Sequence, residues 1–270
     1  MNSHLTLIVG LLLGAALRPP GPASAQDAAP PAALEDFLRS ARVVSVDKSG
    51  MGGRTSPWIA TLSDGTVERR AVFKYVDRRR PALLPDSFRY ELAAYELSKL
   101  IGLRIVPPVV ERDVEGIPGS LQIFLENCVR YRDLKSRGLA PPDTEQFLSA
   151  LAEIRIFENL AYNECGNLED TMIHEEDWRI CRVDFSEAFA PEPGLIPGCK
   201  ITRCSRALYD ALRTLDPPRI RAALGAFLSE TELDALIERK ERVLAVLDEL
   251  IRDMGEQAVL FGPPPGTDSR

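Results

Sequence analysis

The first half of the chain alternates short runs of β-branched and apolar residues with turn residues, which is typical of antiparallel strands. Strand patterns cover residues 42–46, 58–62, 70–76, 106–110 and 120–125. Between the third and the fourth of these, Asp86 or Ser87 caps a stretch with apolar residues at helical spacing, which ends at Gly102. The predicted order of elements is therefore β-β-β-α-β-β.

Helical periodicity dominates the second half. One helix begins at Asp143 and carries apolar residues at helical spacing as far as Leu160. Another begins at a capping box on Ser229 and ends at Gly255, and a short strand at residues 178–183 lies between the two helices. A run of strands followed by a run of helices indicates the α+β class.

The chain begins with an apolar run at residues 5–17, followed by the A-x-A form of a signal-peptidase site at residues 23–25. The run is too short to cross a bilayer comfortably. We therefore expect a cleaved secretory signal over residues 1–25 and a secreted or periplasmic protein, with an uncleaved anchor as the alternative. Residues 26–41 are interpreted as a flexible lead-in and residues 262–270 as a disordered tail. No other segment is apolar enough to cross a membrane.

Composition argues against several classes of function. The net charge is −7, and the densest basic run, Arg78 to Arg80, is short, which argues against nucleic acid as the main partner. The sequence contains no C-x-x-C pair, and only His174 remains after signal cleavage. Zinc binding and catalysis by Ser-His-Asp or Cys-His groups are therefore not expected.

Lys74 stands out in the third predicted strand, because period-two geometry places it on the same face as Val72 and Val76. A snorkelling lysine on an edge strand would explain this pattern by itself. The order of elements supports another interpretation, since in the N-terminal lobe of a kinase a third-strand lysine contacts nucleotide phosphates and a helix glutamate, here Glu91, holds it. A glycine-rich lip over the phosphates would come from three residues after the first strand: Gly50, Gly52 and Gly53.

Acidic residues gather in the loop NECGNLEDTMI, residues 163–173, and Asp184 follows in an apolar run. Kinase chemistry needs an acid that orients the accepting hydroxyl, an oxygen ligand five residues later, and a carboxylate on the next hairpin that holds magnesium. Positions 165, 170 and 184 have this spacing. The pattern predicts Asp170 and Asp184 as magnesium ligands.

The chain resembles the bacterial kinase-fold proteins described as phosphatidylinositol 3/4-kinase-like, which are related to HipA-type kinases and to the Golgi casein kinases of the animal secretory pathway. The similarity extends over residues 42–261 and rests on AVFK, DSFRYELAAYELSKLIGLRIVPPVVER, EGIPGSLQ, IFENLAYN, EDWRICRVDFSEAFA and TRCSRAL. It implies a bilobal protein-kinase-like fold, with an N-terminal lobe (antiparallel sheet plus one helix) over residues 42–126 and a mostly helical C-terminal lobe over residues 127–261. It also implies ATP and Mg²⁺ as cofactors.

The loop departs from the family pattern Y-N-x-D-R-N-x-x-N-x-L at the position that carries the chemistry. Cys165 stands at the catalytic aspartate, Gly166 at the following arginine and Asp170 at the metal-binding asparagine, whereas Asn167 and Asp184 are retained. The acid that orients the hydroxyl is therefore missing. Glu164, one residue earlier, is the candidate replacement, although a neighbouring loop residue generally points elsewhere.

Five cysteines allow at most two disulfides. In an exported protein we interpret Cys165 as half of a disulfide or as an inert thiol in preference to a nucleophile. Cys199 and Cys204 are the favoured pair.

The retained and missing residues together favour an exported pseudokinase that binds nucleotide and acts as a regulator or scaffold for a protein partner. One alternative is an active phosphotransferase that modifies a protein, lipid or carbohydrate hydroxyl with the remaining acids in an altered geometry. Another alternative is a structural binding module that holds no nucleotide.

Overall fold

The computed structural model describes residues 29–49, 52 and 55–262. In its first half, five strands form one antiparallel sheet in the order β1-β2-β3-β7-β6. These strands are β1 (Arg42–Asp47), β2 (Trp58–Ser63), β3 (Glu68–Lys74), β6 (Val109–Val114) and β7 (Ile117–Ile123). Helix α2 (Phe88–Leu100) lies between β3 and β6 in sequence, preceded by the short pair β4 (Asp77–Arg78) and β5 (Asp86–Ser87). The predicted order of the main elements is confirmed.

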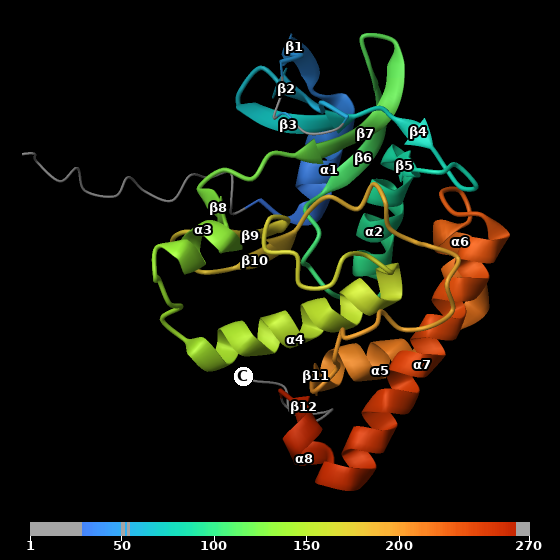
Figure 1. The fold of residues 1–270 in the computed structure, drawn as a ribbon. Helices are drawn as coiled ribbons and strands as arrows, with labels where there is room; N and C mark the ends of the chain where they lie inside the picture. Colours follow the sequence, from blue (N-terminus) through green and yellow to red (C-terminus); the bar gives the residue numbers. More distant parts are fainter. Residues whose placement is uncertain (1–28, 50–51, 53–54, 263–270) are drawn as a thin grey trace, which may run out of the picture.

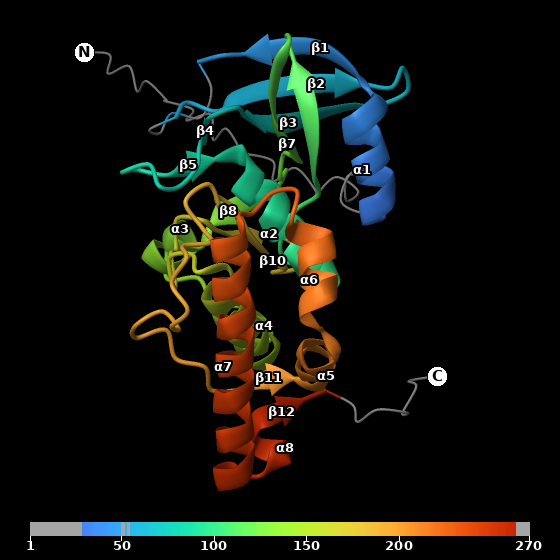
Figure 2. The ribbon, with the colours of Figure 1, turned by 90° about the vertical axis from the view of Figure 1, so that its right-hand side faces the viewer.

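The second half is mostly helical. Its helices are α3 (Tyr131–Ser136), α4 (Thr144–Ala161), α5 (Arg206–Thr214), α6 (Pro217–Leu224), α7 (Glu230–Met254) and α8 (Glu256–Val259). A small antiparallel sheet has the order β10-β9-β8, formed by β8 (Cys128–Arg130), β9 (Thr171–His174) and β10 (Ile180–Arg182). The strands β11 (Cys204–Ser205) and β12 (Leu260–Phe261) pair in parallel. Figures 1 and 2 show the larger sheet at one end of the molecule and the helices at the other.

Local capping chemistry sets where the long helices begin. The Ser87 side chain accepts a hydrogen bond from the Arg89 amide at the start of α2, and Asp143 accepts one from the Gln146 amide at the start of α4. At α7, Ser229 takes part in the predicted capping box. Each cap satisfies backbone N–H groups that have no partner within the helix.

Two hydrophobic cores organise the molecule. The smaller core lies on the face of the sheet to which Ala71 and Phe73 point, and it includes Phe37 and Leu38 of α1 (Pro31–Ser40). By strand alternation, Lys74 points to the other face. The larger core contains α2 together with the helical half, so α2 joins the two halves (Figure 2).

The interpretation of residues 26–41 as a flexible lead-in is wrong for residues 31–40, which form α1. The Ala/Pro-rich composition concealed an amphipathic spacing in which Leu34 and Phe37 pack against the sheet. Glu35 also accepts a hydrogen bond of 2.8 Å from the Tyr95 hydroxyl of α2.

The predictions for residues 1–25 and 263–270 lie outside the described residues. Among the residues that are described, no helix is both long enough and apolar enough to span a membrane.

Candidate functional site

Lys74 connects the two halves of the molecule. Its Nζ lies 2.5 Å from Glu91 Oε1 in α2 and 2.8 Å from Asp184 Oδ1, which follows β10. Pairing of β3 with β7 fixes the end of the strand that carries Lys74, and the Ser87 cap fixes the first turn of α2 that carries Glu91. The predicted contact of Lys74 with Glu91 is present, and Asp184 lies against the same ammonium.

Asp184 has a left-handed backbone, with φ of +63°. A residue other than glycine adopts this conformation only where surrounding contacts hold it, at a cost of about 1–3 kcal/mol. Here the side-chain Nδ2 of Asn163 donates to the Asp184 carbonyl at 3.3 Å, and the backbone N–H of Phe185 donates to Glu91 Oε1 at 3.0 Å. Glu91 therefore holds both Lys74 and the backbone next to Asp184.

Asn167 joins two acids of the loop. Its Nδ2 donates to Glu164 Oε2 at 3.0 Å and to Asp170 Oδ2 at 2.6 Å. The Val183 amide donates to the Asp170 carbonyl at 3.0 Å, which places the Asp170 backbone beside the segment that leads to Asp184. The side-chain amide of Asn167 therefore brings the Glu164 carboxylate near Asp170. The expectation that Glu164 does not take the place of the missing aspartate stays a prediction.

The site carries an excess of negative charge. Burial raises the pKa of Asp170 to about 6, and the nearby charges of Asp184 and Glu164 act in the same direction. Burial alone would raise the pKa of Asp184, but the charge and hydrogen bond of Lys74 hold it below its ordinary value. Burial alone would lower the pKa of Lys74, but Glu91 and Asp184 raise it, so the ammonium stays charged. A bound cation would relieve the repulsion that acts on Asp170.

Asp170→Asn is expected to stabilise the cation-free protein at neutral pH by about 1–2 kcal/mol, because it removes a half-buried carboxylate repelled by Asp184. Since the pKa of Asp170 rises from 3.8 to about 6 on folding, the folded state binds more protons between these values. The contribution of Asp170 to the free energy of unfolding therefore falls as pH rises from 3.8 to about 6. Urea unfolding should show only a small difference between variant and wild type near pH 4, a difference that grows up to about pH 6, and a constant difference above pH 7.

Asp113→Asn, which removes an exposed carboxylate of β6 outside the site, is the control and should leave the free energy of unfolding within about 0.5 kcal/mol of the wild type. A pH-independent effect of Asp170→Asn would contradict the charge argument.

Cys165 is not a thiol in this structure. It forms a disulfide with Cys199, with the two Cα atoms 5.8 Å apart. The predicted pairing of Cys199 with Cys204 is wrong, because Cys199 is bonded to Cys165 and Cys204 remains a free cysteine buried in β11. The interpretation of Cys165 as half of a disulfide is confirmed, and its role as a nucleophile is excluded while the bridge is closed.

A buried ion cluster beneath the loop has no counterpart in the sequence predictions. Glu158 of α4 and Arg182 of β10 are both 0% exposed, and Arg182 Nε lies 3.3 Å from Glu158 Oε1. Glu158 Oε2 accepts hydrogen bonds from Arg155 at 2.8 Å and from the Gly166 amide at 3.1 Å. The signal for this cluster was a glutamate within the apolar stripe of the helix. The cluster holds the loop backbone in place.

Gly166 suits this cluster in both backbone conformation and size. Its φ is +72°, and an added Cβ would lie 2.6 Å from Arg155 Nη1. The Arg155 guanidinium thus occupies the space that a side chain at position 166 would need.

The predicted glycine-rich lip is only partly described. Gly50 and Gly53 lie outside the described residues, whereas Gly52 has φ of +73°, a conformation that favours glycine. A role for these residues toward phosphates stays a prediction.

Two cavities of about 930 and 950 Å³ lie elsewhere, along the C-terminal end of α2, and neither is lined by Lys74, Asp170 or Asp184. Because Lys74 Nζ already lies 2.8 Å from Asp184 Oδ1, a phosphate that bound Lys74 would compete with Asp184 for the ammonium.

Comparison with known proteins gives a fold. No protein-family model and no curated protein matches the sequence. The crystal structure of the Helicobacter pylori proinflammatory kinase CtkA matches 80% of this chain and 98% of its own, with a TM-score of 0.52 and 11% sequence identity. The fold is kinase-like. A complete dimer of CtTel1 with C2 symmetry matches 77% of this chain and 12% of its own, with a TM-score of 0.38 and 13% identity.

The kinase-like fold confirms the predicted α+β class and the bilobal arrangement of an antiparallel sheet and a helical part. The particular bacterial family and the roles of the individual site residues stay predictions.

Proposed function

We propose that the protein is an exported pseudokinase that binds ATP with Mg²⁺ and regulates a protein partner. One contrast carries the proposal. The ion contacts of Lys74 with Glu91 and Asp184 are assembled, while the position expected to hold the hydroxyl-orienting acid is the disulfide-bonded Cys165. The groups expected to bind nucleotide are thus retained, whereas the acid expected to promote phosphoryl transfer is missing.

The donor set suits magnesium. Asp170 and Asp184 offer carboxylate oxygens, the ligands that Mg²⁺ prefers, and the raised pKa of Asp170 reflects burial and negative charge that a divalent cation would offset. Bound magnesium would neutralise charge on the nucleotide phosphates. Lys74 would hold those phosphates, with Glu91 keeping its ammonium in place.

A second candidate function, active phosphotransfer, is favoured by the position of Glu164. Because Asn167 holds Glu164 and Asp170 through one amide nitrogen, a carboxylate is available beside the expected metal site. In this version Glu164 orients the accepting hydroxyl in place of the missing aspartate.

Mg-ATP is expected to raise the stability of the wild-type mature chain, by roughly 2.7 kcal/mol at a ligand concentration a hundred times the dissociation constant. Thermal unfolding with and without Mg-ATP measures this gain. Lys74→Met and Asp184→Asn should each lose it. Lys99→Met, which removes a surface lysine of α2, and Asp113→Asn are controls that should keep it. No gain in the wild type would defeat nucleotide binding and favour a structural module.

Transfer of the γ-phosphate separates the two candidates. A pseudokinase should show the same background transfer as Asp184→Asn. Transfer that exceeds this background and disappears in Glu164→Gln would replace the pseudokinase with the second candidate.

A further inference from the structure

An apolar tip projects from the loop between β4 and β5. We define the apolar tip as residues 81–85, with the sequence PALLP. Leu83 is 95% exposed and Leu84 is 57% exposed. Both ribbon views show this loop leaving the body of the molecule (Figures 1 and 2). Exposure of adjacent leucines to water is energetically unfavourable. A contiguous exposed apolar segment therefore indicates a site that contacts another molecule or a membrane.

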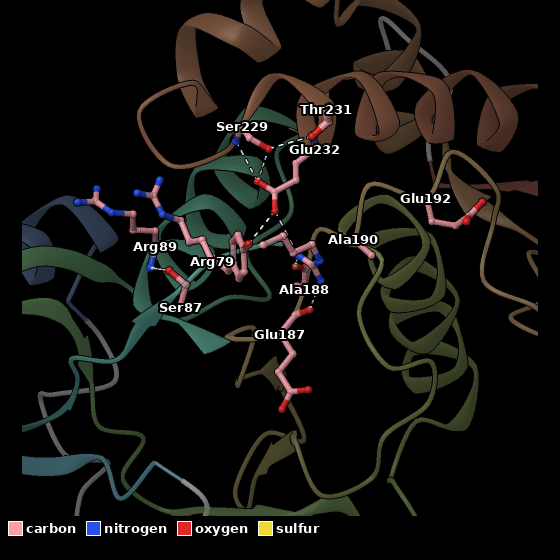
Figure 3. A network of polar contacts seen from close by, with 12 residues as sticks. Arg79, Ser87, Arg89, Glu187, Ala188, Ala190, Glu192, Ser229, Thr231 and Glu232 are labelled. Carbon is pink, nitrogen blue, oxygen red and sulfur yellow. Dashed lines mark hydrogen bonds and ion pairs between the residues drawn. The ribbon is translucent and has the colours of Figure 1, made fainter. Parts of the chain in front are cut away.

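The base of the apolar tip is held firmly. Arg80 donates to the carbonyl oxygens of Ala188 at 3.0 Å and Glu187 at 2.9 Å, and it lies 3.2 Å from Glu232 Oε1. Glu232 is buried and also accepts hydrogen bonds from the Tyr90 hydroxyl and the Ser229 amide (Figure 3). This network spans the loop, α2, the segment after Asp184 and α7. The leucines therefore project from a fixed support.

Positive charge lies on the N-terminal side of the apolar tip. Arg78 and Arg79 are exposed there, separated from the tip by Arg80. The neighbouring acid, Asp77, is engaged by Arg89 at 3.1 Å and by Arg79 at 3.3 Å. Apolar side chains beside arginines suit the interface of a bilayer, where apolar groups enter the acyl boundary and cations meet anionic headgroups.

The size of the apolar tip distinguishes a bilayer from a protein partner. A stable protein interface buries about 800 Å² on each partner, more than this five-residue segment can supply. Insertion into a bilayer needs only the few side chains that reach the acyl boundary. We infer that the apolar tip inserts into the surface of a bilayer containing anionic lipid, with Arg78 and Arg79 at the headgroups. This inference does not depend on nucleotide binding.

Cosedimentation of the mature chain with vesicles tests the inference. The wild type should bind vesicles of phosphatidylcholine mixed with phosphatidylglycerol more strongly than vesicles of phosphatidylcholine alone. Leu83→Ser/Leu84→Ser should weaken binding about tenfold or more, since burial of each leucine contributes substantially. Arg78→Gln/Arg79→Gln should weaken binding by about fivefold per residue and reduce the preference for anionic lipid.

Leu139→Ser/Leu148→Ser is the matched control, because these leucines are 45% and 50% exposed but lie outside the apolar tip. It should bind vesicles as the wild type does. Absence of wild-type binding to anionic vesicles, or an equal loss in the control, would overturn the inference. Self-association in solution that requires Leu83 and Leu84, measured by light scattering, would overturn it in favour of a second copy of the chain.

Discussion

Arg182→Met is expected to lower the free energy of unfolding by about 3–5 kcal/mol, because it leaves the carboxylate of Glu158 buried without one of its two guanidinium partners. Both side chains are 0% exposed, and burial already raises the pKa of Glu158. Arg155 still contacts Glu158 from the partly exposed side, so some compensation persists. Urea unfolding at pH 7 measures the loss.

A double variant distinguishes a buried charge from simple loss of packing. Glu158→Gln/Arg182→Met removes both charges and keeps an acceptor for the Gly166 amide, so it should be more stable than Arg182→Met alone. Arg203→Met, which breaks a surface pair with Glu145, should cost less than about 1 kcal/mol. Additive losses in the double variant would show that the pair is not coupled.

Cys165→Ser/Cys199→Ser is expected to lower the free energy of unfolding by about 3–4 kcal/mol. The bridge joins residues 34 positions apart, and closing a loop of this length restricts the unfolded chain. The bridge also ties the acidic loop to the segment around Cys199, whose carbonyl accepts a hydrogen bond from Asn159 at 3.2 Å.

Reduction provides the control for this loss. A reductant should lower the stability of the wild type by a similar amount and should leave the double serine variant unchanged. Alkylation of the denatured, unreduced wild type should modify three cysteines: Cys128, Cys181 and Cys204. Modification of all five cysteines would show that the bridge does not form.

Much of the fold follows from short-range patterns. Period-two alternation places Lys74 on one face of β3, and the Ser87 cap sets the first turn of α2, so these local patterns place both residues once the order of elements in a kinase lobe assigns Glu91 to Lys74. Asp184 was identified because kinase chemistry restricts the spacing of acids along the chain. These features depend on residues two to four positions apart, or on a motif that fixes their order.

Predictions failed where the deciding partner lies far away in sequence. The flexible lead-in became α1 because the sheet provides an apolar surface for Phe37, which composition cannot show.

The chain by itself determined the order of strands and helices, the helix caps and the acids available to the site, because hydrogen bonds and side-chain periodicity act over a few residues. The tertiary structure alone decided that Cys165 joins Cys199, that Glu158 meets Arg182, and that Glu164 turns toward Asp170. The first two contacts join residues more than twenty positions apart in the sequence. The third depends on the hydrogen bonds of the Asn167 side chain. These contacts form only when β10, α4 and the acidic loop are brought together in the folded core, which involves the whole chain at once.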